Sequence, residues 1–290
     1  MAPTAKHRLS ETDLTTQTLA RLDKPDDPRL AEIFEALVRH SHAFVREVGL
    51  THQEWQTGVA FLRAIADFSD DKRNEMILMS DHLGISAMVD LISDRGKTSE
   101  TSATGLGPFY IPGQPILAND SSILTSDVPG KPMWFRGRVE DTAGQPVENC
   151  LIEVWQAHEE GLYDLQEGEA INMRGTFKTD AQGYFGFTAV YPKGYPLPPD
   201  GPVKPVMEKV KSAYMRPAHL HTLVRAAEDA PPLVTHLFMP EDPYLDNDPV
   251  MGVRSDLMVD VEELPADAEG LPETLAGKAS VMLVRYTFVI

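Results

Sequence analysis

The sequence has 290 residues, 42% of them hydrophobic, which allows one or two domains with a full apolar core. Its formal net charge of −18 argues against nucleic acid as a partner, because an acidic surface repels phosphate backbones. Cys150 is the single cysteine, which excludes an internal disulfide and a cysteine-based zinc cluster and fits a cytoplasmic protein. We expect neither a secretory signal nor membrane insertion, since the N-terminal stretch lacks an apolar segment and the apolar runs are short.

The first hundred residues have a helical pattern. Residues 10–13 and 51–54 fit capping boxes, and Asp27 precedes a proline suited to the first turn of a helix. Apolar residues between these starts recur every three or four positions, as on one face of a helix. Examples are Leu30, Ile33, Leu37, Phe44 and Val48, and then Val59, Leu62, Ile65 and Phe68.

After Lys97 glycine, proline, serine and threonine accumulate, and from Met133 the pattern becomes that of short strands bounded by turns. Many short strands with irregular connections are typical of a β-sandwich, so we predict an α+β protein in which a helical N-terminal domain precedes a β-sandwich. We expect residues 191–205, rich in proline and glycine, to form an ordered irregular loop. The predicted strands are 134–139, 151–155, 184–190, 219–225, 233–239 and 281–290.

His219 and His221 stand two residues apart at the start of a predicted strand. Side chains with this spacing point to the same face of a strand, so two imidazoles can share one metal ion. His40 and His42 have the same spacing in a helical segment, where the two side chains diverge and cannot chelate. The strand pair is therefore the candidate metal site.

Tyrosines, not carboxylates, are the other candidate ligands near this pair. Tyr195 lies upstream in the proline-rich segment, and Tyr163 follows a predicted strand. Phenolate oxygens suit ferric iron and imidazole completes a mixed set, although most tyrosines serve only in packing. On the residues alone two other readings stay open: a non-catalytic binding module with zinc on His219, His221 and His236, and a metal-dependent hydrolase.

Four motifs lie in order between residues 107 and 221. They are Gly107-Pro108-Phe109-Tyr110, then Leu151-Ile-Glu-Val-Trp-Gln-Ala-His158 with Gly161-Leu-Tyr163, then Gly194-Tyr195 with Asp200-Gly-Pro202, and Arg216-Pro-Ala-His219-Leu-His221. Together they resemble the intradiol ring-cleavage dioxygenases, and the helical N-terminus resembles the catechol branch of that family. Leu78-Met-Ser-Asp81-His-Leu-Gly84, Thr235-His236-Leu-Phe and the segment 244–252 are similar to the branch that cleaves hydroxyquinol (benzene-1,2,4-triol).

The resemblance implies a helical dimerisation domain at residues 1–105 and a catalytic β-sandwich at 106–290. It implies one Fe³⁺ per subunit on Tyr163, Tyr195, His219 and His221, with Arg216 and Tyr195 acting in catalysis. The implied substrates are dioxygen and an aromatic diol or triol. The resemblance favours hydroxyquinol as this substrate, and catechol or a chlorocatechol is the alternative. A homodimer, with a lipid between subunits, is implied as well. The pocket wall would comprise Leu78, Asp81, Leu106, Gly107, Pro108, Phe109, Leu197, Pro198 and Arg216.

Overall fold

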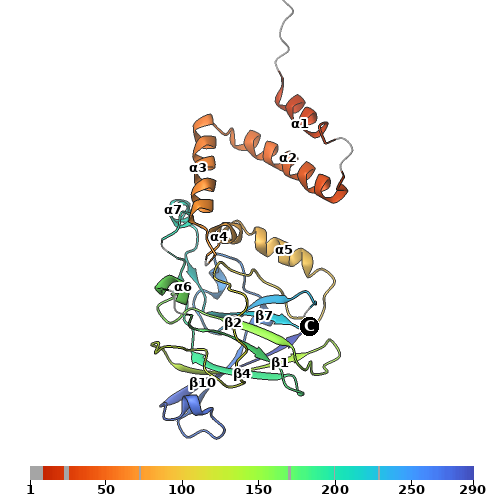
Figure 1. Ribbon diagram of the computed structural model, residues 1–290. Coiled ribbons are helices and arrows are strands. Elements are labelled where there is room, and N and C mark those ends of the chain that lie inside the picture. The colour runs from red at the N-terminus through yellow and green to blue at the C-terminus, as the bar shows by residue number, and fades with distance from the viewer. Residues whose placement is uncertain (1–8, 23–25, 72, 169–170, 199, 228) are drawn as a thin grey trace, which may run out of the picture. The chain divides into compact units, whose positions relative to one another are not determined.

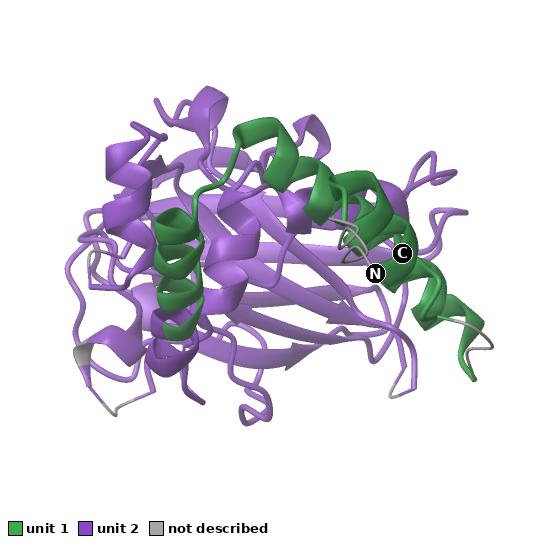
Figure 2. Ribbon diagram, turned by 90° about the horizontal axis from the view of Figure 1, so that it is seen from above, with its two compact units in different colours: residues 1–63 green, residues 64–290 purple. Residues whose placement is uncertain are grey.

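A computed structural model describes residues 9–22, 26–71, 73–168, 171–198, 200–227 and 229–290. The chain divides into two compact units, residues 1–63 and 64–290, which are coloured separately in Figure 2. The expected domain boundary between residues 105 and 106 is a different division and stays a prediction.

Three helices begin at the predicted capping residues: α1 (Glu11–Leu19), α2 (Pro28–Val48) and α3 (His52–Phe68). Ser10 and Asp13 form a capping box, and Thr51 and Glu54 bond reciprocally before α3. Asp27 accepts a hydrogen bond from Leu30 N at 3.0 Å, with the proline at the first helical position. The sequence interpretation of these three starts is confirmed. No residue of α1 or α2 is buried.

Two further helices, α4 (Glu75–His82) and α5 (Ile85–Ser93), belong to the second unit. Asn74 caps α4, and Gly84 separates the pair with a φ of 67°, a left-handed conformation that glycine adopts without strain. Within the described residues no single helix is long and apolar enough to cross a membrane. The pair α4 and α5, which is bent by 77°, has the length and composition of a span only when both helices are counted together.

The second unit is built on a β-sandwich (Figure 1). One sheet has the order β4-β1-β10-β9, formed by β4 (Tyr184–Val190), β1 (Pro132–Glu140), β10 (Ser280–Val289) and β9 (Asp260–Pro265). The other has the order β3-β2-β7-β8, formed by β3 (Arg174–Lys178), β2 (Leu151–Trp155), β7 (His219–Arg225) and β8 (Leu233–Phe238). The α+β prediction is confirmed.

The core lies between these sheets. Phe135 and Phe187 from one sheet pack with Ile152, Phe177 and Leu220 from the other, all fully or almost fully buried. Because side chains alternate along a strand, the residues between these positions point to the opposite face. His219, His221 and Trp155 therefore lie on the outer face of the β3-β2-β7-β8 sheet.

All six predicted strands exist, with ends that shift by no more than two residues. The prediction missed β3, β9 and the short pair β5 (Tyr195–Pro196) and β6 (Met215–Arg216). The expectation of an irregular loop at 191–205 was incomplete, since β5 lies inside it and α7 (Val203–Lys209) begins there. The remaining short elements are α6 (Asp164–Glu167) and the 3-10 turns η1 (Leu245–Asn247), η2 (Ser255–Leu257) and η3 (Glu273–Leu275).

Candidate active site

His219 and His221 lie at the start of β7 with their Nε2 atoms 3.2 Å apart. Both rings are buried, at 2% and 1% exposure. His219 Nδ1 donates to the Pro217 carbonyl at 2.7 Å, which leaves the lone pair of the ring on Nε2. The two-residue spacing thus produces the shared face that it predicted.

Two phenol oxygens meet these nitrogens. Tyr163, at the N-terminus of α6, places its Oη 2.8 Å from His221 Nε2. Tyr195, on β5, places its Oη 2.9 Å from the Tyr163 oxygen and 3.4 Å from His219 Nε2. Residues from three separate stretches of chain therefore bring four donor atoms together in a buried cluster.

The donor set fits a single metal ion. Ligands about 2.1 Å from an ion lie about 3 Å from one another at right angles, which matches the observed separations of 2.8–3.4 Å. Two oxygens and two imidazole nitrogens form a mixed set that iron accepts. Among the described residues no group of three or more His, Cys, Asp or Glu is arranged to hold a metal, so His219, His221 and His236 do not by themselves provide the zinc site considered above.

Burial sets the protonation of the cluster. It lowers the pKa of His219 to about 3, with Arg216 adding to the effect, and it lowers the pKa of His221 well below the ordinary value. The imidazoles are therefore neutral and able to act as ligands. Burial also raises the pKa of Tyr163 well above its usual value and raises that of Tyr195. A cation bound between the two oxygens would stabilise the phenolate forms and so lower the pKa values of both tyrosines, as bound metals do.

Close packing fixes the orientation of His221. In the antiparallel pairing of β2 with β7, Trp155 stands opposite His221, and the two rings stack with centroids 4.9 Å apart and planes at 14°. Gly107, at φ 77°, also packs closely, since a Cβ on it would lie 2.7 Å from His221 Cε1. These contacts hold the imidazole ring in its orientation.

The two tyrosines are held in the same way. Gly161, at φ 83°, packs so closely that a Cβ on it would lie 2.2 Å from the Tyr195 Cβ. Phe109 stacks on Tyr163 with ring centroids 4.6 Å apart. Next to Tyr163, Asp164 forms a buried ion pair with Arg174, whose guanidinium also donates to the Phe109 carbonyl at 3.0 Å. The ion pair thus connects the backbone next to Tyr163, a candidate ligand, to Phe109, a candidate pocket residue.

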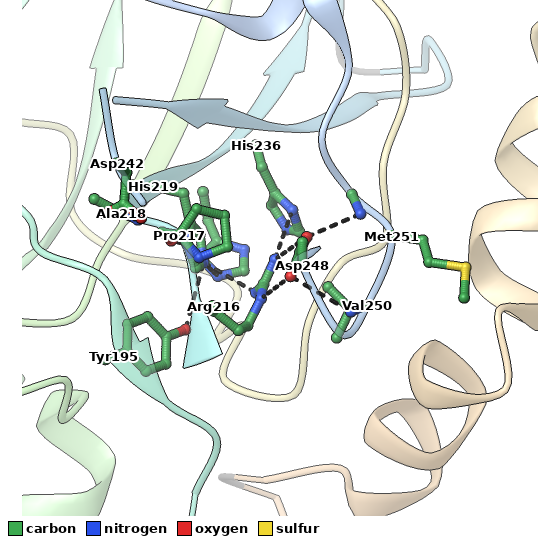
Figure 3. Close-up of polar contacts among 12 residues, drawn as sticks. Tyr195, Arg216, Pro217, Ala218, His219, His236, Asp242, Asp248, Val250 and Met251 are labelled. Carbon is green, nitrogen blue, oxygen red and sulfur yellow. Dashed lines mark hydrogen bonds and ion pairs between the residues drawn. The ribbon is translucent and has the colours of Figure 1, made fainter. Parts of the chain in front are cut away.

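Arg216 is buried beside the cluster, on β6 and paired in register with Tyr195 (Figure 3). Its NH1 donates to His219 Nε2 at 3.0 Å, and its Nε lies 3.2 Å from Asp248 Oδ1. Burial alone would lower the pKa of Arg216, but the Asp248 carboxylate and the nearby tyrosines outweigh it, so the pKa is raised and the positive charge is secure. The arginine charge therefore points at the donor cluster.

Apart from Arg216, the predicted pocket residues lie in three parts of the chain: residues 106–109, helix α4 and the segment after Tyr195. Leu106 packs with Phe109, Trp155 and both tyrosines, and Gly107 contacts His221 as described. Pro108 accepts a hydrogen bond from Asn74 N, which connects this wall to α4, the helix that carries buried Leu78 and Asp81. Leu197 and Pro198 follow Tyr195 and are buried as well. That these residues line a substrate pocket stays a prediction.

The sequence interpretation missed Asp248 and the Asp164–Arg174 pair. It left the role of His236 open, and this ring is buried with its centroid 4.2 Å from that of His221, opposite it on β8. Cross-strand alternation could have placed His236 on the metal face once β7 and β8 were paired. No local signal links Asp248 to Arg216, which precedes it by 32 residues.

Comparison with known proteins agrees with this geometry. Residues 106–290 match the family model for dioxygenases, and residues 27–101 match that for the catechol dioxygenase N terminus. Hydroxyquinol 1,2-dioxygenase of Rhodococcus opacus is 40% identical over 88% of this chain and 85% of that protein. Catechol 1,2-dioxygenase of Candida albicans is 36% identical over 88% and 84%.

Among solved structures, hydroxyquinol 1,2-dioxygenase from Pseudomonas putida DLL-E4 is similar, with a TM-score of 0.82. It is 39% identical, and the match covers 96% of this chain and 97% of that one. The likeness thus extends over the helical N-terminal region and both sheets. The chain belongs to the family of intradiol ring-cleavage dioxygenases.

Proposed function

We propose that this protein is an iron-dependent dioxygenase that opens hydroxyquinol between its two adjacent hydroxyls, inserting both atoms of dioxygen. The product is 3-hydroxy-cis,cis-muconate, or its tautomer maleylacetate. The observation that carries the proposal is a ring of two phenol oxygens and two imidazole nitrogens in which successive atoms lie 2.8–3.4 Å apart, in a chain 40% identical to a hydroxyquinol 1,2-dioxygenase.

Members of this family use non-haem iron. In our proposal Tyr163, Tyr195, His219 and His221 hold one Fe³⁺, and the two phenolates offset part of its charge. The bound ion would acidify the hydroxyls of a coordinated diol and draw electron density from its ring. Tyr195 Oη would accept one hydroxyl proton, since burial raises its pKa and favours the protonated phenol. Arg216 would stabilise negative charge that develops on the ring.

Asp81 supports hydroxyquinol over catechol as the substrate. Its side chain is buried at 6% exposure, and its Oδ1 has no hydrogen-bond partner in the described structure. A buried carboxylate oxygen without a donor suits the third hydroxyl of hydroxyquinol, which catechol lacks. The alternative, catechol, is the substrate named for the Candida albicans relative.

The direct test is oxygen uptake by the iron-loaded protein with hydroxyquinol and catechol side by side. We expect faster uptake with hydroxyquinol, bound iron, and a phenolate-to-iron absorption band in the visible range. Tyr163→Phe should remove this band or most of the iron together with activity, because it deletes one donor oxygen. A Tyr163→Phe variant that kept both colour and activity would contradict the ligand assignment.

We also propose that the protein is a homodimer through its N-terminal helical domain, residues 1–105. Large apolar side chains of α2 are 43–59% exposed, which is costly for an isolated chain. A lipid held between subunits would cover part of this surface. Sedimentation at micromolar concentration tests the dimer, and mass analysis of an organic extract tests the lipid. The cytoplasmic location stays a prediction.

A further inference from the structure

Besides the nearby tyrosines, the buried guanidinium of Arg216 contacts His219, His236 and Asp248, which differ in charge (Figure 3). His219 Nε2 lies 3.0 Å from NH1, and His236 Nδ1 lies 3.5 Å from NH2. Both imidazoles are neutral because burial lowers their pKa values. Asp248 approaches Nε at 3.2 Å and NH2 at 3.5 Å along one edge of the guanidinium. This two-point contact fixes the plane of the group.

The contact with His219 competes with the proposed iron site. His219 Nδ1 donates to Pro217, so Nε2 carries the only lone pair on the ring. That lone pair cannot accept a hydrogen bond from Arg216 and bind a cation at the same time. Once the ion is held, the guanidinium loses this acceptor and is repelled by the added positive charge. The Asp248 carboxylate then has to hold Arg216 in place.

Asp248 is itself held rigidly. Its side chain is 2% exposed and directly follows η1. Oδ2 accepts a hydrogen bond from Gly252 N at 2.9 Å, and the Asp248 carbonyl accepts one from Met251 N at 3.0 Å. A Cβ on Gly252 would lie 3.2 Å from Oδ2 and 3.2 Å from His236 Nδ1. The turn 248–252 therefore sets the position of the carboxylate from its own backbone.

We propose that Asp248 is the positioning residue of Arg216, holding the guanidinium at the ring of the bound substrate. Asp248 would touch neither substrate nor iron, and would act entirely through the arginine. This inference rests on the proposed function. A displacement of about 1 Å in a catalytic group can cost about 100-fold in rate, so loss of the two-point contact should lower turnover strongly.

A double-mutant cycle separates positioning from a general structural role. The variants are Asp248→Asn, Arg216→Gln and the two combined, with Asp246→Asn as a matched control that removes the same charge at an exposed site in the same segment. In the native background we expect Asp248→Asn to lower kcat about 100-fold. In the Arg216→Gln background its effect should fall below about 3-fold, because groups that act as a unit are not additive.

Iron content and the visible band give a readout that is independent of turnover. We expect both to be unchanged in all variants, and Asp246→Asn to keep full activity. A kcat loss from Asp248→Asn that is equal in both backgrounds, or a loss of iron or colour, would overturn the positioning role. If the unaltered protein neither bound iron nor consumed oxygen, the proposed function itself would fail, and this role with it.

Gly252→Ala provides a milder second variant in case Asp248→Asn does not fold. Its methyl group presses on Oδ2 while leaving every charge in place. We expect a smaller loss of kcat, about 10-fold, that again disappears in the Arg216→Gln background. A Gly252→Ala enzyme with unchanged kcat, or one whose loss persists without Arg216, would contradict the proposal.

Discussion

Replacing Asp81 with asparagine should make the protein more stable and less active. Burial raises the pKa of Asp81 from 3.8 to about 6, and the Ser86 hydroxyl and the Arg216 charge oppose only part of this effect. A shift of about two units at about 1.4 kcal/mol per unit corresponds to about 3 kcal/mol. The ionised carboxylate therefore destabilises the fold, even with the Ser86 hydroxyl beside it.

The direction of this pKa shift determines how the stability of Asp81→Asn should depend on pH. Because the folded pKa is above the unfolded one, the folded state binds more protons between pH 4 and 6, and stability is lost as the pH rises through that window. Asp81→Asn is uncharged throughout. Its advantage should be near zero at pH 4 and grow to at most about 3 kcal/mol above pH 7, as measured by urea unfolding. Asp246→Asn, an exposed site, controls for the change in net charge.

Activity should change in the opposite direction. A hydrogen bond to a charged acceptor contributes about 1.5–3 kcal/mol, so the variant should lose about 10- to 150-fold in kcat/KM with hydroxyquinol. Catechol has no third hydroxyl, and its loss should be much smaller. A stability gain that does not depend on pH, or equal losses with the two substrates, would refute the reasoning.

Two further substitutions test the packing around the donor atoms. Gly107→Ala should lower kcat about 100-fold, because its methyl group would lie 2.7 Å from His221 Cε1 and displace that ring. Gly113→Ala is the matched control, since it adds the same backbone strain at φ 78° with nothing within 4 Å; similar activities in the two variants would argue against a collision at His221. Arg174→Met should lower the free energy of unfolding by about 3–5 kcal/mol, because it leaves the Asp164 carboxylate buried without its partner. Adding Asp164→Leu should restore part of that stability in urea unfolding, and a double variant as unstable as the single one would contradict this explanation.

The fold was largely readable where short strand-like segments are bounded by turn signals. β2 and β7 are such segments, buried on both faces, and both strands were predicted within a residue. β9 escaped because it is an edge strand with charged residues at half of its positions and no buried residue. β5 and β6 span only two residues each, too few for any period to be detected.

The candidate site was readable only in part. The spacing of His219 and His221 predicted a shared face from strand geometry alone. Tyr163 and Tyr195 could be assigned only through the family resemblance, because their approach depends on the β5–β6 pairing and on a tight turn at Gly161. Asp248 was beyond reach, since its contact with Arg216 is made by the tertiary fold and has no local pattern.

The parallel pairing of β1 with β10 has a consequence for how the protein folds. Met133 pairs with Met282, so the middle of one sheet forms between segments about 150 residues apart. Contacts of such long range slow folding, since the chain entropy of closing the loop must be lost before the pairing stabilises anything. Refolding from urea should therefore be slow, and intermediates that lack the β1–β10 ladder would expose strand edges prone to aggregation.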